Sequence, residues 1–309
     1  MGNISFVILN YKAYQEAIAC AESVLKTQDY EDIQIVIVDN GSGNGSAEKL
    51  REHFAARQRV HIVESLENLG FARGNNLGIR YAREHFSPDF IVAANSDILF
   101  EQPDFCRKLT EIYARRRYDI LGGDVVDASR TQHFNPVAME RRYTLNYMRK
   151  QVFISWAKSA AFRLMKCLHL QKMSAGPSGE VEKEQGMGTR KATREVSGKS
   201  VAADSRINEE LTGVLLHGCC LVFSKDFFRE FDGFYDKTFL YAEEEILYYL
   251  AMKCGMTLLY APEVTCVHKE AVSTNYVLKD VCDAKIFYFS NITKSYRLFL
   301  KLMKQNREP

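Results

Sequence analysis

Four short runs of apolar residues, separated by stretches with helical spacing, constrain the fold more than any other feature of the sequence. The runs cover residues 4–9, 33–38, 60–63 and 90–94, and most of them are rich in Ile and Val. Continuous apolar runs of this length are typical of parallel strands that are buried on both faces. Because helical patterns alternate with them, the sequence predicts an α/β fold with a mostly parallel sheet flanked by helices.

Polar residues stand where three of these runs end. Asn10 follows the first run, Asp39 the second and Asp97 the fourth. The carboxyl ends of parallel strands meet at one sheet edge, where α/β proteins bind ligands. Asp39 can accept hydrogen bonds from a base or ribose there, and Asp97 can hold a cation or a polar substrate group. Both also fit simple turns, because Asp bonds its own backbone readily, so the residues alone leave the two interpretations open.

The segment Leu69-Gly70-Phe71-Ala72-Arg73-Gly74-Asn75-Asn76 opens a helix and is punctuated by glycines. Free amides at a helix start attract anions, so this segment fits a diphosphate, and Arg73 adds positive charge. The pattern is neither a dinucleotide-binding fingerprint nor a phosphate-binding loop. Tight packing is the alternative explanation for its glycines.

Three acidic residues open a later helix that we expect to end at Gly255. Glu243 and Glu244 precede Leu247 by four and three residues, so both project toward the buried side, whereas Glu245 points elsewhere. Acids in a first helical turn are usually solvated. A partly desolvated carboxylate, by contrast, can act as a general base near neutral pH. Farther on, His268 follows a strand directly, and it could share a divalent cation with Asp97 if the fold brings the two together.

The segment 145–168 changes character, because it carries an apolar helical stripe with five basic residues between: Arg149, Lys150, Lys158, Arg163 and Lys166. A basic amphipathic helix can lie on an anionic membrane surface. It can equally pack its stripe against the rest of the protein or a partner subunit. Residues 173–210 contain no aromatic residue and are typical of a mobile loop, and the tail 278–305 is amphipathic and aromatic-rich.

Composition excludes several classes of protein. The net charge of +2 gives no general footprint for nucleic acid. The eight cysteines form no Cys-x-x-Cys pair, which argues against a zinc site or a disulfide framework. Residues 1–10 resemble a first strand rather than a signal peptide, and no apolar run reaches the length of a membrane span. We therefore expect a cytoplasmic protein, with peripheral contact at the inner face of the cytoplasmic membrane as an option.

Taken in order, these motifs resemble the family 2 glycosyltransferases of the GT-A nucleotide-sugar-binding fold, especially bacterial rhamnosyltransferase-like members that build surface polysaccharides. The resemblance spans about residues 4–269, apart from 137–210. It rests on these segments: Val7-Ile8-Leu9-Asn10-Tyr11, Ile37-Val38-Asp39-Asn40-Gly41-Ser42, the glycine-punctuated helix start, Asn95-Ser96-Asp97, and Phe239-Leu240-Tyr241-Ala242-Glu243-Glu244 with His268 downstream.

The resemblance implies a role for each matching residue. Asp97 matches the last carboxylate of the family's metal motif, and His268 completes a site for Mg²⁺ or Mn²⁺. Glu244 matches the catalytic base and Glu243 its neighbour. The donor nucleotide sugar is expected to contact the remaining site residues: Asn10, Asp39, Ser42, Arg73, Asn75 and Asn95. Two positions depart from the pattern, since Asn95 replaces the first Asp of the metal motif and Ile246 a second helical Asp.

The resemblance implies an inverting, metal-dependent transfer of a sugar from a nucleoside diphosphate, UDP or dTDP, to a glycan or lipid-linked glycan. Residues 1–136 are expected to bind the nucleotide sugar, 137–210 to form a basic helix and flexible insertion, 211–275 to complete the catalytic half, and 276–309 to form a C-terminal helix. A non-catalytic nucleotide-sugar binder is the alternative. A nucleotidyltransferase is disfavoured, because residues 10–14 lack its glycine-rich, lysine-bearing loop.

Overall fold

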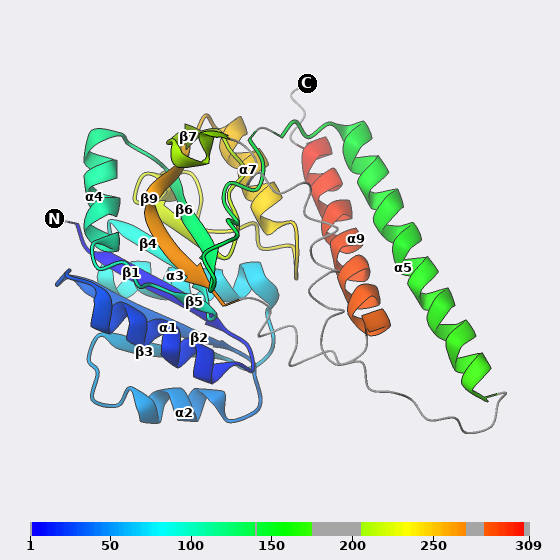
Figure 1. Cartoon of the computed structure of the whole chain (residues 1–309), viewed down its shortest axis with the longest axis horizontal. Helices are drawn as coiled ribbons and strands as arrows, with labels where there is room; N and C mark the ends of the chain where they lie inside the picture. Colours follow the sequence, from blue (N-terminus) through cyan, green and yellow to red (C-terminus); the bar gives the residue numbers. More distant parts are fainter. Residues whose placement is uncertain (1, 140, 175–204, 270–280, 306–309) are drawn as a thin grey trace.

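The computed structural model describes residues 2–139, 141–174, 205–269 and 281–305. Most of the predicted loop at 173–210 therefore lies outside the described residues, as do 276–280 and 306–309 of the predicted C-terminal segment. Within the described part, one sheet runs through the centre of the α/β body (Figure 1). Its strands lie in the order β3-β2-β1-β4-β8-β6-β9-β5, and β7 pairs with β9.

The first half of the chain forms the predicted βαβ units. Its strands are β1 (Ile4–Asn10), β2 (Ile33–Asn40), β3 (Val60–Ser65) and β4 (Phe90–Asn95), and its helices are α1 (Tyr14–Thr27), α2 (Ser46–His53) and α3 (Gly70–Phe86). β1 pairs in parallel with both β2 and β4, and β2 with β3. The parallel sheet predicted from the apolar runs is confirmed.

The second half adds strands of mixed direction: β5 (Ile98–Leu99), β6 (Ile120–Asp127), β7 (Leu211–Thr212), β8 (Cys220–Ser224) and β9 (Leu258–His268). β8 is antiparallel to both β4 and β6, whereas β9 is parallel to β6. The sequence suggested two short strands within 257–267, but β9 is a single strand. Its register against β6 shifts after Gly123 pairs with Ala261, because Asp124 pairs with Thr265. This irregularity interrupts the apolar pattern without ending the strand.

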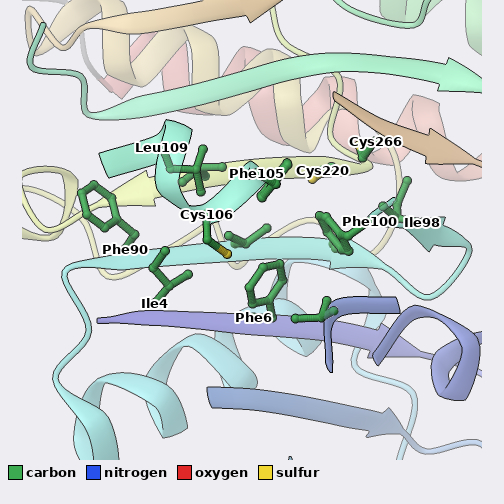
Figure 2. Packing of buried hydrophobic residues seen from close by; sticks show 14 of the residues in the cluster. Ile4, Phe6, Phe90, Ile98, Phe100, Phe105, Cys106, Leu109, Cys220 and Cys266 are labelled. Atoms are coloured by element: carbon green, nitrogen blue, oxygen red, sulfur yellow. The ribbon is translucent and has the colours of Figure 1, made fainter. Parts of the chain in front are cut away.

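Aromatic packing holds helix α4 (Phe105–Arg115) against one face of the sheet. Figure 2 shows side chains from β1, β4, β5 and α4 in this core. The Phe100 ring lies 5.0 Å from Phe6 and 5.0 Å from Phe105, edge to face in both pairs. Such pairs are stabilising beyond the area they bury. They fix the segment immediately after Asp97 against the first strand.

Three helices complete the structure: α7 (Glu243–Lys253), α5 (Leu145–Ser174) and α9 (Val281–Gln305). In Figure 1, α9 lies between α5 and the α/β body. Met148 of α5, Ile246 of α7 and Phe299 of α9 are buried in one cluster that joins the three helices. Cys254 falls at helical spacing from Leu247 and Leu250, which predicts that it is buried with them, but it is exposed. The helix ends at Lys253, so Cys254 is its C-terminal cap rather than part of its apolar stripe.

Candidate active site

Asn10 and Asp39 lie side by side at the carboxyl ends of β1 and β2, where the strand register pairs them. The amide nitrogen of Asn10 donates to Asp39 Oδ2 at 2.9 Å. The backbone amide of Ser42 donates to the other carboxylate oxygen at 2.9 Å, and the Ser42 hydroxyl accepts from Lys12 N–H at 2.8 Å. All three predicted residues are buried. The structure thus brings Asn10, Asp39 and Ser42 together, with the Asp39 carboxylate held in one orientation.

Asn40, which the sequence analysis quoted but gave no role, joins this corner to the start of α3. Its side-chain amide donates to Gly70 O at 3.0 Å, and its carbonyl oxygen accepts from Leu69 N–H at 3.0 Å. Gly41 makes the close approach possible, because a Cβ there would lie 2.2 Å from the Glu67 carbonyl carbon. The pattern alone gave no sign of this role, since Asn in a turn ordinarily bonds locally.

The predicted free amides at the start of α3 are already engaged by the protein. Gly70 N–H donates to Asn68 Oδ1 at 2.9 Å, and Phe71 N–H donates to Phe239 O at 2.8 Å. Together with Leu69, bonded to Asn40, the first donors that we assigned to a diphosphate are satisfied. These amides are therefore not free as we expected, because Asn40, Asn68 and the Phe239 carbonyl before α7 accept their hydrogen bonds. Contact of the helix start with a diphosphate stays a prediction.

Two predicted residues of α3 differ in their surroundings. Arg73 is exposed, with its guanidinium 3.7 Å from Glu67. Asn75 is buried, and its side-chain amide donates to Phe71 O within the same helix at 3.0 Å. Contact of either residue with a nucleotide sugar stays a prediction.

Asp97 and His268, which are far apart in the sequence, are brought together by the pairing of β5 with β9. Ile98, the residue after Asp97, lies opposite His268 in that pair. His268 Nε2 is 3.3 Å from Asp97 Oδ1, and both side chains are largely buried. Nevertheless, Asp97 Oδ1 and His268 Nδ1 have no hydrogen-bond partner among the described residues. Asn95 ends the adjacent strand β4, and its side chain also makes no hydrogen bond in the described part of the chain.

These unpaired buried atoms fit a divalent cation. An unpartnered carboxylate oxygen in a buried site is costly, and carboxylate plus imidazole is a common donor set for such ions. Within the described ranges, no group of three or more His, Cys, Asp and Glu side chains could hold a metal. Asp97 and His268 would therefore supply two ligands, and the remaining positions would be left for oxygens of a ligand or water.

The first turn of α7 brings Glu243 and Glu244 to the same region. Tyr241 and Ala242, directly before it, both adopt left-handed backbone conformations, with φ of 73° and 69°. Such conformations are unfavourable for residues with a Cβ and occur often at functional sites. Glu243 is buried, and Glu244 is only partly buried. Of the two, Glu244 is therefore the carboxylate that a substrate can reach.

Burial and mutual repulsion set the ionisation of these acids. Burial, reinforced by the charge of Glu244, raises the pKa of Glu243 to about 8. Burial also raises the pKa of Glu244. At neutral pH Glu243 is therefore protonated in large part, and the charge of Glu244 contributes to that shift. Glu245 differs from our expectation, since it is also turned inward: it lies 3.5 Å from Arg141, and burial followed by the charge of Glu244 raises its pKa to about 7.

Residues 217 and 218, just before β8, lie between the Asp97–His268 pair and the acidic first turn of α7. The ring of His217 lies 6.3 Å from that of His268, centre to centre. A Cβ on the next residue, Gly218, would lie 3.6 Å from Glu244 Oε2. In the sequence, His217 interrupts the apolar run 214–223 together with Gly218. That interruption was the available signal, because a polar residue inside a buried run marks a site or a bend.

Asn135 holds the backbone of His217, and Cys219 fixes its ring. The His217 amide donates to Asn135 Oδ1 at 2.6 Å, and Cys219 N–H donates to His217 Nδ1 at 3.2 Å. Nδ1 is therefore the acceptor, and Nε2 carries the proton. Burial, with the nearby His268, lowers the pKa of His217 to about 4, so the ring is neutral.

The sequence profile described as "Glycosyl transferase family 2" matches residues 5–173, more than half of the chain. The chain belongs to this family. Its α/β fold is the GT-A fold of family 2 and related transferases. One similar structure is the mannosyltransferase PcManGT of Pyrobaculum calidifontis in complex with GDP-Man and Mn²⁺. The TM-score is 0.54 at 13% identity, and the match covers 97% of this chain and 73% of that one. GalNAc-T7 with UDP, GalNAc and Mn²⁺ is similar with a TM-score of 0.54 at 14% identity, over 87% of this chain and 44% of that one.

Several curated family relatives match a shorter part of the chain. The low-salt glycan biosynthesis hexosyltransferase Agl10 of Haloferax volcanii is 24% identical over 41% of this chain and 38% of its own. The putative glycosyltransferase EpsH of Bacillus subtilis is 30% identical over 34% of this chain and 29% of its own. The match thus spans about a third of each relative.

Proposed function

We propose that this family 2 protein is an inverting, metal-dependent glycosyltransferase that moves a sugar from a nucleoside diphosphate to a hydroxyl of a glycan or lipid-linked glycan. The observation that carries the proposal is the meeting of Asp97, His268 and Glu244 around one short segment, His217-Gly218-Cys219. A non-catalytic binding protein would need no substrate-accessible carboxylate, such as Glu244, beside the Asp97–His268 pair.

The donor side is formed by the strand ends. Asp39, held by Asn10 and Ser42, has lone pairs left to accept hydrogen bonds from the base, and Asn95 faces the same edge. Asp97 and His268 would hold Mg²⁺ or Mn²⁺, which when bound neutralises charge on the departing diphosphate. GDP-Man and UDP accompany Mn²⁺ in the two solved relatives, which supports a nucleotide-sugar donor.

Glu244 acts on the acceptor side as general base. Its carboxylate accepts the proton of the acceptor hydroxyl, whose oxygen forms the new bond to the anomeric carbon as the bond to the diphosphate breaks on the opposite face. One displacement inverts the anomeric configuration, and no sugar–enzyme bond forms. Glu244 is the less buried of the two acids, which favours this role, because an acceptor hydroxyl can reach its carboxylate.

The physiological setting that we propose is cell-surface polysaccharide synthesis at the inner face of the cytoplasmic membrane, with UDP- or dTDP-sugars, including dTDP-rhamnose, as donors. The resemblance to rhamnosyltransferase-like members supports this choice. The name of Agl10, a glycan biosynthesis hexosyltransferase, is consistent with glycan synthesis.

The test is calorimetric titration of the full chain with UDP, dTDP and GDP, with and without Mn²⁺, followed by assay of the matching sugar donors. We expect metal-dependent binding of one nucleotide and turnover of its sugar ester. Glu244→Gln should retain nucleotide affinity and lose about 10²- to 10⁴-fold in turnover, the usual contribution of a general base.

Two outcomes would overturn the proposal. Near-normal turnover of Glu244→Gln would remove the base. Nucleotide binding without turnover of any sugar donor, in the wild type, would favour the non-catalytic binder.

A further inference from the structure

The covered face of helix α5 is only partly apolar: Met148 is buried near the helix start, but small polar residues are buried farther along it, where several large apolar residues are exposed. Ser155 and Ser159 are buried against α9, where Thr293 Oγ1 donates to Ser155 Oγ at 2.9 Å and the hydroxyls of Ser159 and Ser290 lie 3.0 Å apart. A helix that packs one face on a protein in water ordinarily places its apolar stripe inward. On α5, only part of the apolar surface is covered.

The uncovered side forms one continuous stripe. Its large members are exposed to between 51% and 64%: Phe153 64%, Trp156 51%, Leu164 61%, Met165 55% and Leu168 51%. Together with the alanines at 157, 160 and 161, they follow the three- and four-residue spacing of a single helix face. Such a contiguous exposed apolar surface marks an interaction site. We call these five large residues the outer stripe.

Positive charge surrounds the outer stripe. Arg149 and Lys150 are exposed and continue its face toward the helix start, since they precede Phe153 by four and three residues. Lys158 and Arg163 fall at its two borders, as 3.6 residues per turn requires. Helices α5 and α9 together contain eleven Lys and Arg and one acidic residue, Asp283. Since the whole chain has 41 basic and 39 acidic residues, the rest of it has 30 and 38.

We propose that the outer stripe of α5 binds an anionic lipid surface, with Phe153, Trp156 and Leu164 in the apolar boundary and the flanking basic residues at the headgroups. The charge distribution favours a lipid surface over a second copy of the chain. Helices α5 and α9 are strongly cationic, so two copies of this face would repel each other, whereas an anionic bilayer attracts it. No helix of the described residues is long and apolar enough to cross a membrane. The arrangement is that of a helix lying along the surface.

The single tryptophan of the chain, Trp156, lies within the outer stripe and reports on it directly. The full-length protein is mixed with vesicles of phosphatidylcholine containing phosphatidylglycerol, or with vesicles of phosphatidylcholine alone. We expect flotation with the anionic vesicles, a shift of tryptophan emission to shorter wavelength, and protection of Trp156 from acrylamide. High salt should weaken binding, because it screens the charges.

Variants separate the apolar and electrostatic contributions while keeping Trp156. Leu164→Gln with Leu168→Gln should abolish the emission shift. Arg149→Gln with Lys150→Gln should weaken vesicle binding roughly tenfold or more, since each basic residue near an anionic surface contributes about a fivefold factor. Leu66→Gln, which changes an even more exposed leucine in the loop before α3, is the control and should bind like the wild type.

Three results would overturn the proposal. Equal vesicle binding by the wild type and the Leu164/Leu168 variant would show that the outer stripe is not the lipid-binding surface. Concentration-dependent dimerisation that protects Trp156 without lipid would assign the face to a second copy. Protection of Trp156 in the lipid-free monomer, with no response to vesicles, would assign it to another segment of this chain, such as 175–204. Vesicle binding does not require sugar transfer, so either proposal can fail while the other stands.

Discussion

Asp97 and His268 are 3.3 Å apart at their nearest side-chain atoms, Oδ1 and Nε2, yet Asp97 Oδ1 forms no hydrogen bond among the described residues. A second Asp–His pair in the molecule behaves differently. His133 Nδ1 lies 2.9 and 3.0 Å from the two carboxylate oxygens of Asp124, as in an ordinary hydrogen-bonded pair. The Asp124–His133 pair thus satisfies its own hydrogen bonds, whereas the Asp97–His268 pair leaves Asp97 Oδ1 and His268 Nδ1 without a partner among the described residues.

Asp97→Asn should weaken Mn²⁺ binding by about 100-fold or more, because the neutral amide is a far poorer ligand for a hard cation. Titration with Mn²⁺ in the absence of nucleotide measures this directly. Asp124→Asn is the matched control and should leave the Mn²⁺ affinity unchanged. Equal losses in both variants would mean that neither pair is the metal site.

Asp97→Asn should also leave the metal-free protein at least as stable as the wild type. The substitution removes a buried charge whose oxygen has no partner. Thermal unfolding in chelator tests this, and a large drop in Tm would show that Asp97 has a structural role instead.

Glu243→Gln should stabilise the protein at pH 8 and have much less effect at pH 5. The pKa of Glu243 is raised from 4.5 to about 8 in the folded state, so the folded protein binds more protons between these values and its stability falls as pH rises through that window. The neutral amide removes this loss. We expect a Tm increase at pH 8 of roughly 3–8 °C. An equal change at both pH values would contradict the assignment.

His217→Ala should lower kcat/KM for sugar transfer about tenfold while nucleotide affinity stays the same. Nε2 of His217 carries a proton and has no hydrogen-bond partner in the described structure, so it can donate to a substrate oxygen between His268 and Glu244. One such bond contributes about 1 kcal/mol. His217→Gln, which keeps a donor, should recover part of the loss. A change in nucleotide affinity alone would place His217 on the donor side.

Gly70→Ala should destabilise the fold by several kcal/mol, because φ is +80° and the new Cβ would lie 2.1 Å from Phe239 O. Gly43→Ala is the control: φ is +61°, but nothing lies within 4 Å, so only the backbone cost of about 1–2 kcal/mol remains. Urea unfolding of both variants measures the difference. Similar losses would show that the contact between α3 and the segment before α7 is unimportant.

The parts predicted well from the sequence are those that local pattern determines. The buried runs before Asn10, Asp39 and Asn95 could form only interior strands, and parallel strands bring their carboxyl ends together whatever the details. Glu243 could be placed inward from its spacing to Leu247.

The features that could not be predicted depend on contacts between segments that are far apart in the sequence. The periodicity of α5 revealed an apolar stripe, but the sequence could not say that Ser155 and Ser159 rather than Phe153 and Trp156 would meet α9. Glu245 was expected to point away, but it lies inward, 3.5 Å from Arg141, a residue about one hundred positions earlier in the chain. The amide of Phe71 is satisfied by the carbonyl of Phe239, a contact that no local rule supplies.

The pairing of β5 with β9 also sets the order in which the protein can become functional as it is synthesised. Strands β1 to β4 are complete within the first 95 residues and can pair early. The corner formed by Asn10, Asp39 and Ser42 can therefore form on a nascent chain. Asp97 must wait about 170 residues for His268 to emerge. Under the proposed function, a chain interrupted between these positions would keep that corner and lack the Asp97–His268 pair, so it would bind its donor without transferring the sugar.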